Sequence, residues 1–497
     1  MKKHEVYEGI VTSVKFPNKG VAVVDDTKCM IKNVLPGQHV LFRVTKKKSG
    51  MCEGNLLEIT KHADNECEPF CRHFGECGGC AYQNLPYKEQ LALKENQVRE
   101  LIENVKGLEL DTPLRDAFQN GDLGTAGNLD AGGVFKHITP SPVQFGYRNK
   151  MEFSFGDAAK DGELELGLHK KGSFYDIVTV RDCRIVDEDF CRILWESLCY
   201  FRGKETPYYH KRSHEGYLRH LIVRKAVKTG EILIDLVTSS QKPADTPCTE
   251  VSLLSDWANM LKGLKLSGHI VGILNTINDA VSDTVIDEGT EILYGQDYFY
   301  EEILGLRFKI TPFSFFQTNS LSAEVLYDMV RRLVMECYET EKTGPVIFDL
   351  YSGTGTIAQL LSPIAGKVIG VEIVEEAVEA AKENAKLNGL HNCEFIAGDV
   401  LKVLDEIEDK PDFIVLDPPR DGINPKALNK IVNYGVDNIV YISCKPTSLA
   451  RDLEIFISRG YEVRTIMPLD QFPGTVHVET CVLLCHQNVT KHNDSVF

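Results

Sequence analysis

The chain has 497 residues and a formal net charge of −17, and 43% of its residues are hydrophobic, a composition typical of soluble globular proteins with about three domains. No apolar run reaches the ~18 residues of a membrane span. No apolar signal core follows the basic start MKKHEVYEGIVTSV, so we expect a cytoplasmic protein without a membrane partner. Its 15 cysteines, an odd number, argue against a disulfide framework and for metal ligation or thiol chemistry.

Residues 1–60 read as a small all-β unit. Short apolar runs alternate with the turn signals PNKG and LPGQ, which is the spacing of a five-stranded barrel of the kind that often binds oligonucleotides. Spacing alone does not distinguish that role from a purely structural barrel. The runs are EGIVTSV, GVAVVDD, CMIKNV and HVLFRVTK.

Residues 61–310 form the second predicted domain, of mixed α+β character. It starts with a cysteine cluster at 61–85, and a helical pattern follows over 85–107. Residues 119–133 hold five glycines and few apolar side chains, so a loop insertion is predicted at about 111–137. Strand patterns recur from about 140 to 310.

Residues 311–497 form the third predicted domain. A helical pattern follows Gln317, and from Pro345 onward apolar strands alternate with helices. This alternation predicts an α/β fold with a doubly wound, largely parallel sheet. The last two strand patterns, YEVRTIMPLD and HVETCVLLC, lie close together in sequence, as in a terminal antiparallel pair.

A glycine loop follows the first strand of this third domain. FDLYSGTGTIA places Gly353 and Gly355 directly after the strand, and Glu372 ends the next strand 19 residues later. Glycines let a backbone approach a ligand, and a carboxylate at that place accepts hydrogen bonds from ribose hydroxyls. The pattern fits NAD enzymes and S-adenosylmethionine enzymes alike.

VLDPPRDG places Asp417 at the carboxyl end of the fourth strand, the ligand-binding edge of such sheets. The two prolines fix a rigid extended turn. Acidic Asp-Pro-Pro loops at this strand recur in methyltransferases that act on nucleobases. The motif leaves adenine, guanine and uracil open as targets, and an ordinary capping aspartate is the bland alternative.

YISCKP places Cys444 at the carboxyl end of the fifth strand. A thiolate that adds to carbon 6 of uracil makes carbon 5 nucleophilic enough to accept a methyl group, whereas a buried small hydrophobe is the bland reading. A base must then remove the proton from carbon 5. Glu479 enters an apolar strand and suits that step if burial raises its pKa; His477 is the competing candidate, and the role of Lys445 stays open.

The stretch CEPFCRHFGECGGCAYQ gathers cysteines at 67, 71, 77 and 80. Four thiols at this spacing suit either a structural zinc ion or an iron–sulfur cluster. Unligated thiols are the remaining reading.

Five motifs now stand in the order and spacing of one family: SFFQTN, DLYSGTGTIA, VLDPPRDG, YISCKP and TVHVE. The chain resembles the RNA 5-methyluridine methyltransferases, which include 23S ribosomal RNA (uracil-5-)-methyltransferases. The resemblance implies a Rossmann-like class I domain that uses S-adenosylmethionine, with Cys444 as nucleophile and Glu479 as proton acceptor. Thr356 and Asp399 occupy positions where other members often carry Asn. The implied cofactor-binding residues are Gln317, Tyr351, Gly353, Gly355, Thr356, Glu372, Asp399 and Asp417.

The resemblance extends to the cysteines and to the front of the chain. The family pattern C-x5-C-G-G-C plus a distant cysteine implies a 4Fe-4S cluster, with Cys67 as a bystander. Residues 1–60 resemble the small TRAM-type RNA-binding barrel of many members, and together these features favour ribosomal RNA over transfer RNA. The implied cluster ligands are Cys71, Cys77, Cys80 and Cys183.

The sequence thus predicts methylation of carbon 5 of a uridine in RNA, by a monomer without an obligate protein partner. A basic run at 210–228 is a candidate RNA contact, although the acidic total charge argues mildly against nucleic acid. The alternatives are an N-methyltransferase of adenine or guanine, a non-enzymatic RNA-binding iron–sulfur protein, and an NAD reductase.

Overall fold

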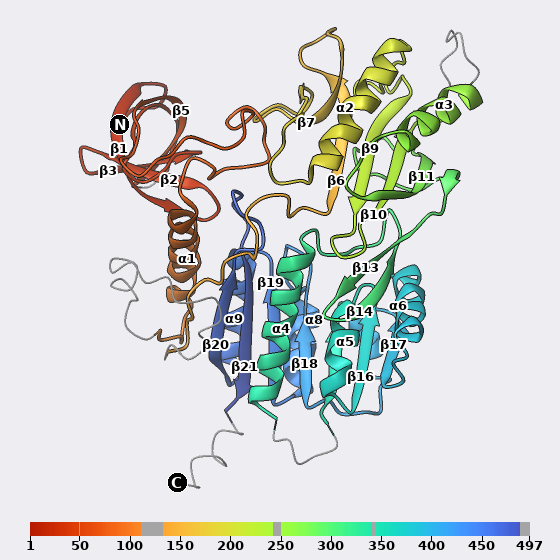
Figure 1. The fold of residues 1–497 in the computed structure, drawn as a ribbon. Coiled ribbons are helices and arrows are strands. Elements are labelled where there is room, and N and C mark those ends of the chain that lie inside the picture. The colour runs from red at the N-terminus through yellow and green to blue at the C-terminus, as the bar shows by residue number, and fades with distance from the viewer. Residues whose placement is uncertain (49, 111–132, 242–249, 339–343, 488–497) are drawn as a thin grey trace.

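The computed structural model describes residues 1–48, 50–110, 133–241, 250–338 and 344–487. Within them lie a closed barrel, a seven-stranded central sheet, a two-stranded hairpin and a seven-stranded C-terminal sheet. Figure 1 shows the barrel and the central sheet both on one side of the C-terminal sheet, above it in this view.

The barrel predicted from the spacing of short strands is present. Its strands are joined in the order β1-β2-β3-β5-β4, with β3 and β5 parallel and the other pairs antiparallel. Alternating residues such as Val40, Phe42 and Val44 point inward and are fully buried. The strands are β1 (Val6–Lys15), β2 (Lys19–Val24), β3 (Thr27–Lys32), β4 (His39–Lys48) and β5 (Met51–Lys61).

Helix α1 (Tyr87–Glu103) joins the barrel to the rest of the molecule, as the sequence predicts, and it packs against both β1 and α9. Leu91, Val98 and Ile102 recur at helical spacing and enter the core on one face of the C-terminal sheet. No helix in the described parts of the chain is long and apolar enough to cross a membrane.

The central sheet has the order β12-β11-β10-β9-β6-β7-β8. Helices α2 and α3 cover one of its faces, where Phe201 and Trp257 are fully buried. The cysteine-bearing segment, residues 67–83, lies against the β7 edge. The elements are β6 (Lys150–Asp157), β7 (Leu164–His169), β8 (Ile177–Val178), α2 (Glu188–Gly203), β9 (Leu218–Lys225), β10 (Glu231–Thr238), α3 (Glu250–Lys262), β11 (His269–Ile277) and β12 (Thr290–Gly295).

The hairpin of β13 (Phe299–Ile303) and β14 (Leu306–Ile310) leads into α4 (Ser320–Glu336), which is capped by the Asn319 side chain. Helix α4 is amphipathic and buries Leu326, Val330 and Leu333 on the C-terminal sheet.

The C-terminal sheet has the order β17-β16-β15-β18-β19-β21-β20. Strands β15 to β19 are parallel, whereas β21 runs antiparallel to both β19 and β20, so the predicted doubly wound sheet with a terminal antiparallel pair is confirmed. The strands are β15 (Val346–Leu350), β16 (Lys367–Glu372), β17 (Cys393–Ala397), β18 (Phe413–Leu416), β19 (Asn438–Ser443), β20 (Tyr461–Leu469) and β21 (Glu479–His486).

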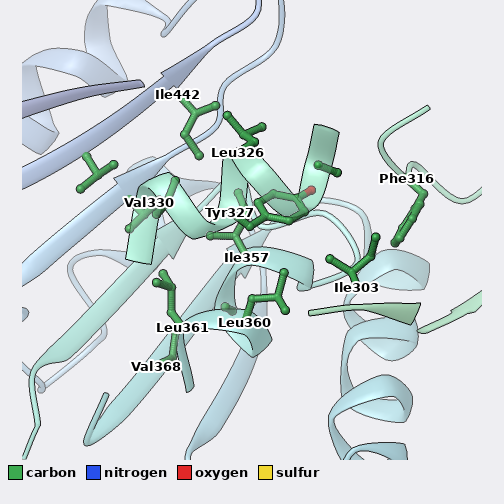
Figure 2. Close-up of a cluster of buried hydrophobic side chains, with 14 of the residues drawn as sticks. Ile303, Phe316, Leu326, Tyr327, Val330, Ile357, Leu360, Leu361, Val368 and Ile442 are labelled. Atoms are coloured by element: carbon green, nitrogen blue, oxygen red, sulfur yellow. The ribbon is translucent and has the colours of Figure 1, made fainter. Parts of the chain in front are cut away.

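Both faces of this sheet are covered, which explains why its strands read as continuous apolar runs. Ile347, Val440 and Ile442 point to one core, and their neighbours point to the other. Figure 2 shows the first of these cores, where α4 and α5 pack on the sheet. The helices are α5 (Thr356–Leu361), the short 3₁₀ turn η2 (Ser362–Ile364), α6 (Glu375–Leu387), α7 (Val400–Val403), α8 (Pro425–Tyr434) and α9 (Pro446–Ser458).

The insertion predicted at about 111–137 falls mostly on residues 111–132, outside the described residues. Immediately after them the chain runs beside β20, where Lys136 N–H donates to the Ile466 carbonyl at 2.8 Å. Thr139 N–H donates to the Pro468 carbonyl at 2.9 Å, so this stretch extends the sheet edge.

Candidate active site

The candidate site lies at the carboxyl edge of the C-terminal sheet, where the strand order reverses. Strand β15 pairs with β16 on one side and with β18 on the other, so the segments that follow β15 and β18 diverge. Ligands of open α/β sheets bind in the crevice at such a switch point. The glycine loop follows β15, and Asp417 follows β18 directly.

The glycine loop adopts the conformation that its residue types allow. Gly353 and Gly355 have φ of 53° and 71°, and Tyr351 shares this left-handed region at 69°. A Cβ on Gly355 would lie 2.5 Å from a ring atom of Phe395 and 2.8 Å from the Ala381 side chain. Only glycine therefore fits where the loop turns into α5.

Glu372 stands at the end of β16 with its carboxylate fixed by backbone donors. One oxygen accepts from Gly353 N–H at 3.0 Å, and the other accepts from Ile373 and Val374 N–H at 2.9 and 3.1 Å. The predicted proximity of Glu372 to the glycine loop is thus present. Each carboxylate oxygen has further acceptor capacity for ligand hydroxyls.

Two carboxyl groups share the switch point, and one of them was missed by sequence reasoning. Asp349 is fully buried in β15; one oxygen accepts from Ala358 N–H at 3.0 Å and the other has no hydrogen-bond partner. Burial and the neighbouring Asp417 raise the pKa of Asp349 to about 8, and burial raises the pKa of Asp417 to about 7. The available signal was an acid inside the apolar strand VIFDL.

Cys444 and Glu479 are brought together by strand register. Ser443 and Thr480 are paired in the β19–β21 ladder, and one step further along the two antiparallel strands stand Cys444 and Glu479. Cys444 is half-buried, and Glu479 is 4% exposed.

The charges around this pair keep it protonated in the absence of ligands. Burial, Glu479 and Asp417 raise the pKa of the Cys444 thiol to about 11, and Arg420 opposes the shift. Burial and Asp417 raise the pKa of Glu479 to about 8, again opposed by Arg420. A positive charge delivered to this edge would favour the thiolate and both carboxylates. Arg420, from the DPPR turn, is a second group that sequence reasoning missed.

Lys445 and Pro446 organise the helix start rather than the strand end. Strand β19 already ends at Ser443, and Pro446 is the first residue of α9, where proline is favoured. Pro446 therefore starts the helix rather than ending the strand. The Lys445 ammonium lies 3.4 Å from the exposed Asp421 carboxylate, a surface contact.

Gln317 is held by a residue from the other end of the domain. Its side-chain oxygen accepts from Gln471 Nε2 at 2.7 Å, so its NH₂ group remains available as a donor. Gln317 also hydrogen-bonds to the hydroxyl of Tyr327, which lies among the apolar side chains of α4 in Figure 2. Burial and the acids at this edge, Asp417 first among them, raise the Tyr327 pKa well above its ordinary value. Sequence reasoning missed Tyr327 and Gln471.

Residues 470–478, which we call the strap, connect the cysteine-bearing segment to the candidate site. The Gly474 carbonyl accepts from Ala81 and Tyr82 N–H at 2.8 and 3.0 Å. The fully buried Lys94 ammonium contacts the Asp470 carboxylate at 2.6 Å. Next to Asp470, the Gln471 carbonyl accepts from the Asn319 side chain at 2.7 Å. The strap then runs directly into Glu479.

The remaining two predicted cofactor-binding residues also lie at this edge. Thr356 is the first residue of α5 and is buried. Asp399 caps α7, with one oxygen accepting from Leu401 N–H at 2.9 Å. Asp399 is close enough to raise the pKa of Tyr351, which burial also raises, to about 12. Asp399 thus has a capping role whatever else it contacts.

The four predicted metal-binding cysteines lie on two segments beside the central sheet, near enough for their thiols to influence one another. Burial and neighbouring thiols raise the pKa of both Cys80 and Cys183 to about 12. Cys77 Sγ accepts from Gly79 N–H at 3.4 Å. Cys67 lies apart, beside the Gln83 carbonyl. Within the described ranges, no group of three or more His, Cys, Asp or Glu side chains is arranged to hold a metal ion.

The basic run at 210–228 divides into two parts. Arg219, His220 and Arg224 are at most 5% exposed and belong to β9, so they are not a surface patch. Lys211 and Arg212 lie in the loop before β9, and Arg212 is exposed. Only the first part of the run remains a candidate nucleic-acid contact.

Comparisons with known proteins agree with this geometry. Residues 341–471 match the model of a methyltransferase domain. The chain is 47% identical over 486 residues to an uncharacterized RNA methyltransferase of Clostridium acetobutylicum, covering 97% of this chain and 98% of that protein. It is 45% identical over 486 residues to one from Caldanaerobacter subterraneus, covering 97% and 99% of the two chains.

A solved structure shares the fold over nearly the whole length. The tRNA (uracil-54, C5)-methyltransferase of Pyrococcus abyssi, in complex with S-adenosyl-L-homocysteine, superposes with a TM-score of 0.69. The match covers 96% of this chain and 100% of that chain at 22% sequence identity. It establishes a common architecture.

Proposed function

Because the chain belongs to the RNA methyltransferases, we propose that it transfers a methyl group from S-adenosylmethionine to carbon 5 of a uridine in RNA. The observation that carries the proposal is the register of β19 and β21, which sets Cys444 beside Glu479. A nucleobase N-methylation needs no thiol at that place. Methylation of carbon 5 of uracil needs a thiol, because carbon 5 is a poor nucleophile until carbon 6 carries an added group.

The thiolate of Cys444 begins the reaction. Its sulfur forms a bond to carbon 6 of uracil, and the electron pair of the 5,6 double bond moves toward carbon 5 and the carbonyl oxygen at position 4. Carbon 5 then attacks the methyl group of S-adenosylmethionine, whose sulfur leaves as the neutral thioether. Burial and the nearby acids raise the pKa of Cys444 to about 11 although Arg420 opposes the shift, so the positive charge of the bound methyl donor would help to form the reactive thiolate.

Glu479 completes the reaction by accepting the proton from carbon 5. The electron pair of that C–H bond re-forms the 5,6 double bond, and the Cys444 sulfur leaves carbon 6. Burial raises the pKa of Glu479 to about 8, whereas burial and Arg420 lower the pKa of His477 to about 4. The stronger base of the two is therefore Glu479.

The cofactor-binding residues are proposed in the same way. Glu372 would accept from the two ribose hydroxyls, since its orientation is already fixed by the glycine loop. Gln317 would donate the N–H that does not bond Tyr327 to the carboxylate of the methionine moiety, and Asp417 would lie beside the sulfonium. The close packing that forbids a side chain at Gly355 leaves the backbone of Tyr351–Gly355 to face the ligand.

We also propose that Cys71, Cys77, Cys80 and Cys183 hold a 4Fe-4S cluster. The ion pair of Arg72 and Asp182, neighbours of the first and last of these cysteines, ties the two segments together. Cys80 accepts from the Gln83 side chain at 3.2 Å, the type of N–H···S bond that surrounds such clusters. Four free cysteine thiols are the donor type that both iron–sulfur clusters and zinc require.

The cluster's proposed role is structural, and the methyl transfer does not require an electron. Its cysteines would anchor the segment that grips the strap. Iron and sulfide analysis of protein purified without oxygen, with the visible absorption spectrum, tests the assignment. Stoichiometric zinc without iron would contradict it.

The RNA substrate is proposed to be ribosomal, with transfer RNA as the second candidate. The barrel and cysteine pattern favour the first, and the shared architecture with a tRNA (uracil-54, C5)-methyltransferase favours the second. The proposed domains are residues 1–60, 61–310 and 311–497. The barrel in the first domain is proposed to bind RNA, and the protein is proposed to act as a monomer. Nucleoside analysis of ribosomal and transfer RNA from cells lacking the gene shows which of the two RNA classes loses its methyluridine.

The direct test is methyl transfer from labelled S-adenosylmethionine to RNA isolated from cells that lack the gene, followed by nucleoside analysis. Carbon-5 methyluridine is expected as the product. Methylated adenine or guanine instead would favour the N-methyltransferase, and no transfer at all would favour a non-enzymatic RNA-binding protein. Tight binding of NAD rather than S-adenosylmethionine would indicate a reductase.

A further inference from the structure

Two exposed aromatic side chains stand together on the loop between β7 and β8. Phe174 is 59% exposed and Tyr175 is 44% exposed. Their rings meet edge to face, with centroids 5.5 Å apart and an interplanar angle of 89°. A single exposed apolar residue is ordinary, but adjacent rings fixed in one geometry indicate a contact surface.

Cations lie against both rings. The Lys211 ammonium is 4.6 Å from the centroid of Phe174, and the Arg212 guanidinium is 4.4 Å from that of Tyr175. The His169 ring is parallel to Phe174 at 6.0 Å, and Lys211 Nζ lies 3.3 Å from His169 Nε2. His169 and Lys211 also touch each other, and with these neighbours in place the Phe174 side chain still remains 59% exposed.

The loop that carries the rings is held in place by the cysteine-bearing segment. Gly78 N–H donates to the His169 carbonyl at 3.1 Å, and Lys171 N–H donates to the Glu76 carbonyl at 2.7 Å. These bonds fix both sides of the loop start. A surface ordered before binding loses less conformational entropy when a ligand arrives.

An ion pair of Lys211 connects the two rings to a neighbouring hollow beside the central sheet. Lys211 contacts the Asp283 carboxylate at 2.8 Å, and Asp283 lines a hollow of about 500 Å³ together with Lys150 and Phe313. Phe313 stands four residues before Gln317 in the chain. The hollow is thus bounded by the ion-pair partner of Lys211 on one side and by the segment that leads to Gln317 on the other.

We propose that Phe174, Tyr175, Lys211 and Arg212 form a stacking platform that binds unpaired nucleotides of the RNA beside the target uridine. Bases stack on open aromatic faces, and the ammonium and guanidinium groups pair with phosphates. In a chain with a net charge of −17, two cations over two exposed rings suit a polyanion with flat bases. The proposal rests on RNA being the substrate, as proposed above.

The test measures binding of a fluorescein-labelled oligouridylate by anisotropy at several salt concentrations. Phe174→Ala and Tyr175→Ala should each weaken binding about 5- to 150-fold, the effect of losing one stacked base, without changing the salt dependence. Arg212→Ala should instead reduce the slope of log affinity against log salt by about 1, the loss of one phosphate contact.

The matched control comes from the opposite edge of the same sheet. Tyr294 on β12 is 40% exposed and lies beneath the Lys262 ammonium at 5.0 Å, so it has the same chemistry without the hollow. Tyr294→Ala should leave oligouridylate binding unchanged. Melting temperatures of all variants establish that each is folded.

An unchanged affinity in the Phe174→Ala/Tyr175→Ala double variant would overturn the platform, as would an equal loss in Tyr294→Ala. Either result would leave the methylation proposal intact, because the binding assay contains no methyl donor. Conversely, loss of binding in the platform variants together with a wild-type enzyme that makes no carbon-5 methyluridine would retain the platform and reject the proposed reaction.

Discussion

The edge of the C-terminal sheet and the cysteine-bearing segment both gather reactive side chains, but by different means. Cys444 and Glu479 follow from the ladder of β19 and β21, in which every step along one strand is fixed by the other. The segment 67–83 contains no strand, and contacts such as Gly78 N–H to the His169 carbonyl hold it in place. One arrangement is built into the sheet, and the other depends on scattered contacts.

The sheet edge therefore carries the reacting groups, whereas the cysteine-bearing segment supports their position. The sheet edge is formed once the strands pair, so its thiol and carboxylates keep their geometry with or without ligands. The cysteine-bearing segment reaches the site through the strap, since it binds the Gly474 carbonyl while Lys94 holds Asp470. Changes at the edge should therefore alter the reaction directly, whereas changes in the segment should alter it through stability and position.

The largest effect is expected from Cys444→Ala. Without the thiol no addition to carbon 6 takes place, and the rate should fall by about 10⁴-fold or more while S-adenosylmethionine still binds. Initial rates with labelled methyl donor and equilibrium dialysis measure the two quantities. Cys481→Ala, which removes a buried thiol two residues beyond Glu479, is the control and should retain most of the activity.

Glu479→Gln should slow turnover by about 10²- to 10⁴-fold, the typical contribution of a general base. The addition and methyl transfer should still occur, so a covalent protein–RNA complex should accumulate on ordinary RNA. Denaturing gels show such a complex directly. A slow variant without accumulated complex would assign Glu479 to an earlier step, and His477→Gln tests the competing base.

Cys80→Ser should act mainly on the cysteine-bearing segment. We expect loss of iron and faster amide hydrogen exchange over residues 67–83 and the strap, while amides of β19 remain protected, because they belong to the sheet. Hydrogen exchange read by mass spectrometry compares these peptides. Equally fast exchange in β19 would show that the sheet edge depends on the cysteine-bearing segment for its stability. Cys67→Ser is the matched control and should leave the iron content and the hydrogen exchange unchanged.

Gln471→Ala should weaken S-adenosylmethionine binding by about tenfold, since a buried hydrogen bond that orients Gln317 is lost. Binding of RNA should change little. Isothermal titration with the cofactor alone measures the first quantity. An unchanged affinity would remove Gln471 from the positioning of Gln317. Gln471→Glu, which cannot donate from its carboxylate, should resemble the alanine variant.

The smallest expected effect is on the pH dependence of stability. Burial raises the pKa of Glu479 from 4.5 to about 8, so the folded protein holds this proton more tightly than the unfolded chain. The resulting stability is present at low pH and is lost as the pH rises toward 8. Glu479→Gln cannot ionise, and its melting temperature should therefore fall less between about pH 5 and pH 8. Glu462→Gln, at an exposed position of β20, is the control.

The barrel, α1 and the C-terminal sheet could be predicted because their patterns are local. Alternating apolar residues, glycine turns and strand–helix alternation depend on neighbours in sequence, and the motif residues fall at strand ends, where the fold places ligand sites. Glu372 and Gly353 meet for that reason.

The missed residues share a different cause. Tyr327 and Gln471 read as ordinary core and loop residues, and their importance arises only from contacts with Gln317, which for Gln471 span more than a hundred residues of chain. Asp349 gave a weak signal as an acid in an apolar strand. For Arg219 the error was the opposite one: it was predicted to contact RNA but is buried in β9. A run of basic residues gives no sign that a strand buries part of it.

The measurement that tests the central claim most directly uses RNA transcribed with 5-fluorouridine. Fluorine cannot leave as a proton, so after methyl transfer the Cys444 sulfur cannot depart from carbon 6. Incubation with S-adenosylmethionine should give a protein–RNA complex that survives denaturation, and mass spectrometry should locate it on the peptide containing Cys444. Methylated carbon 5 on ordinary RNA, with no such complex on fluorinated RNA, would contradict the account.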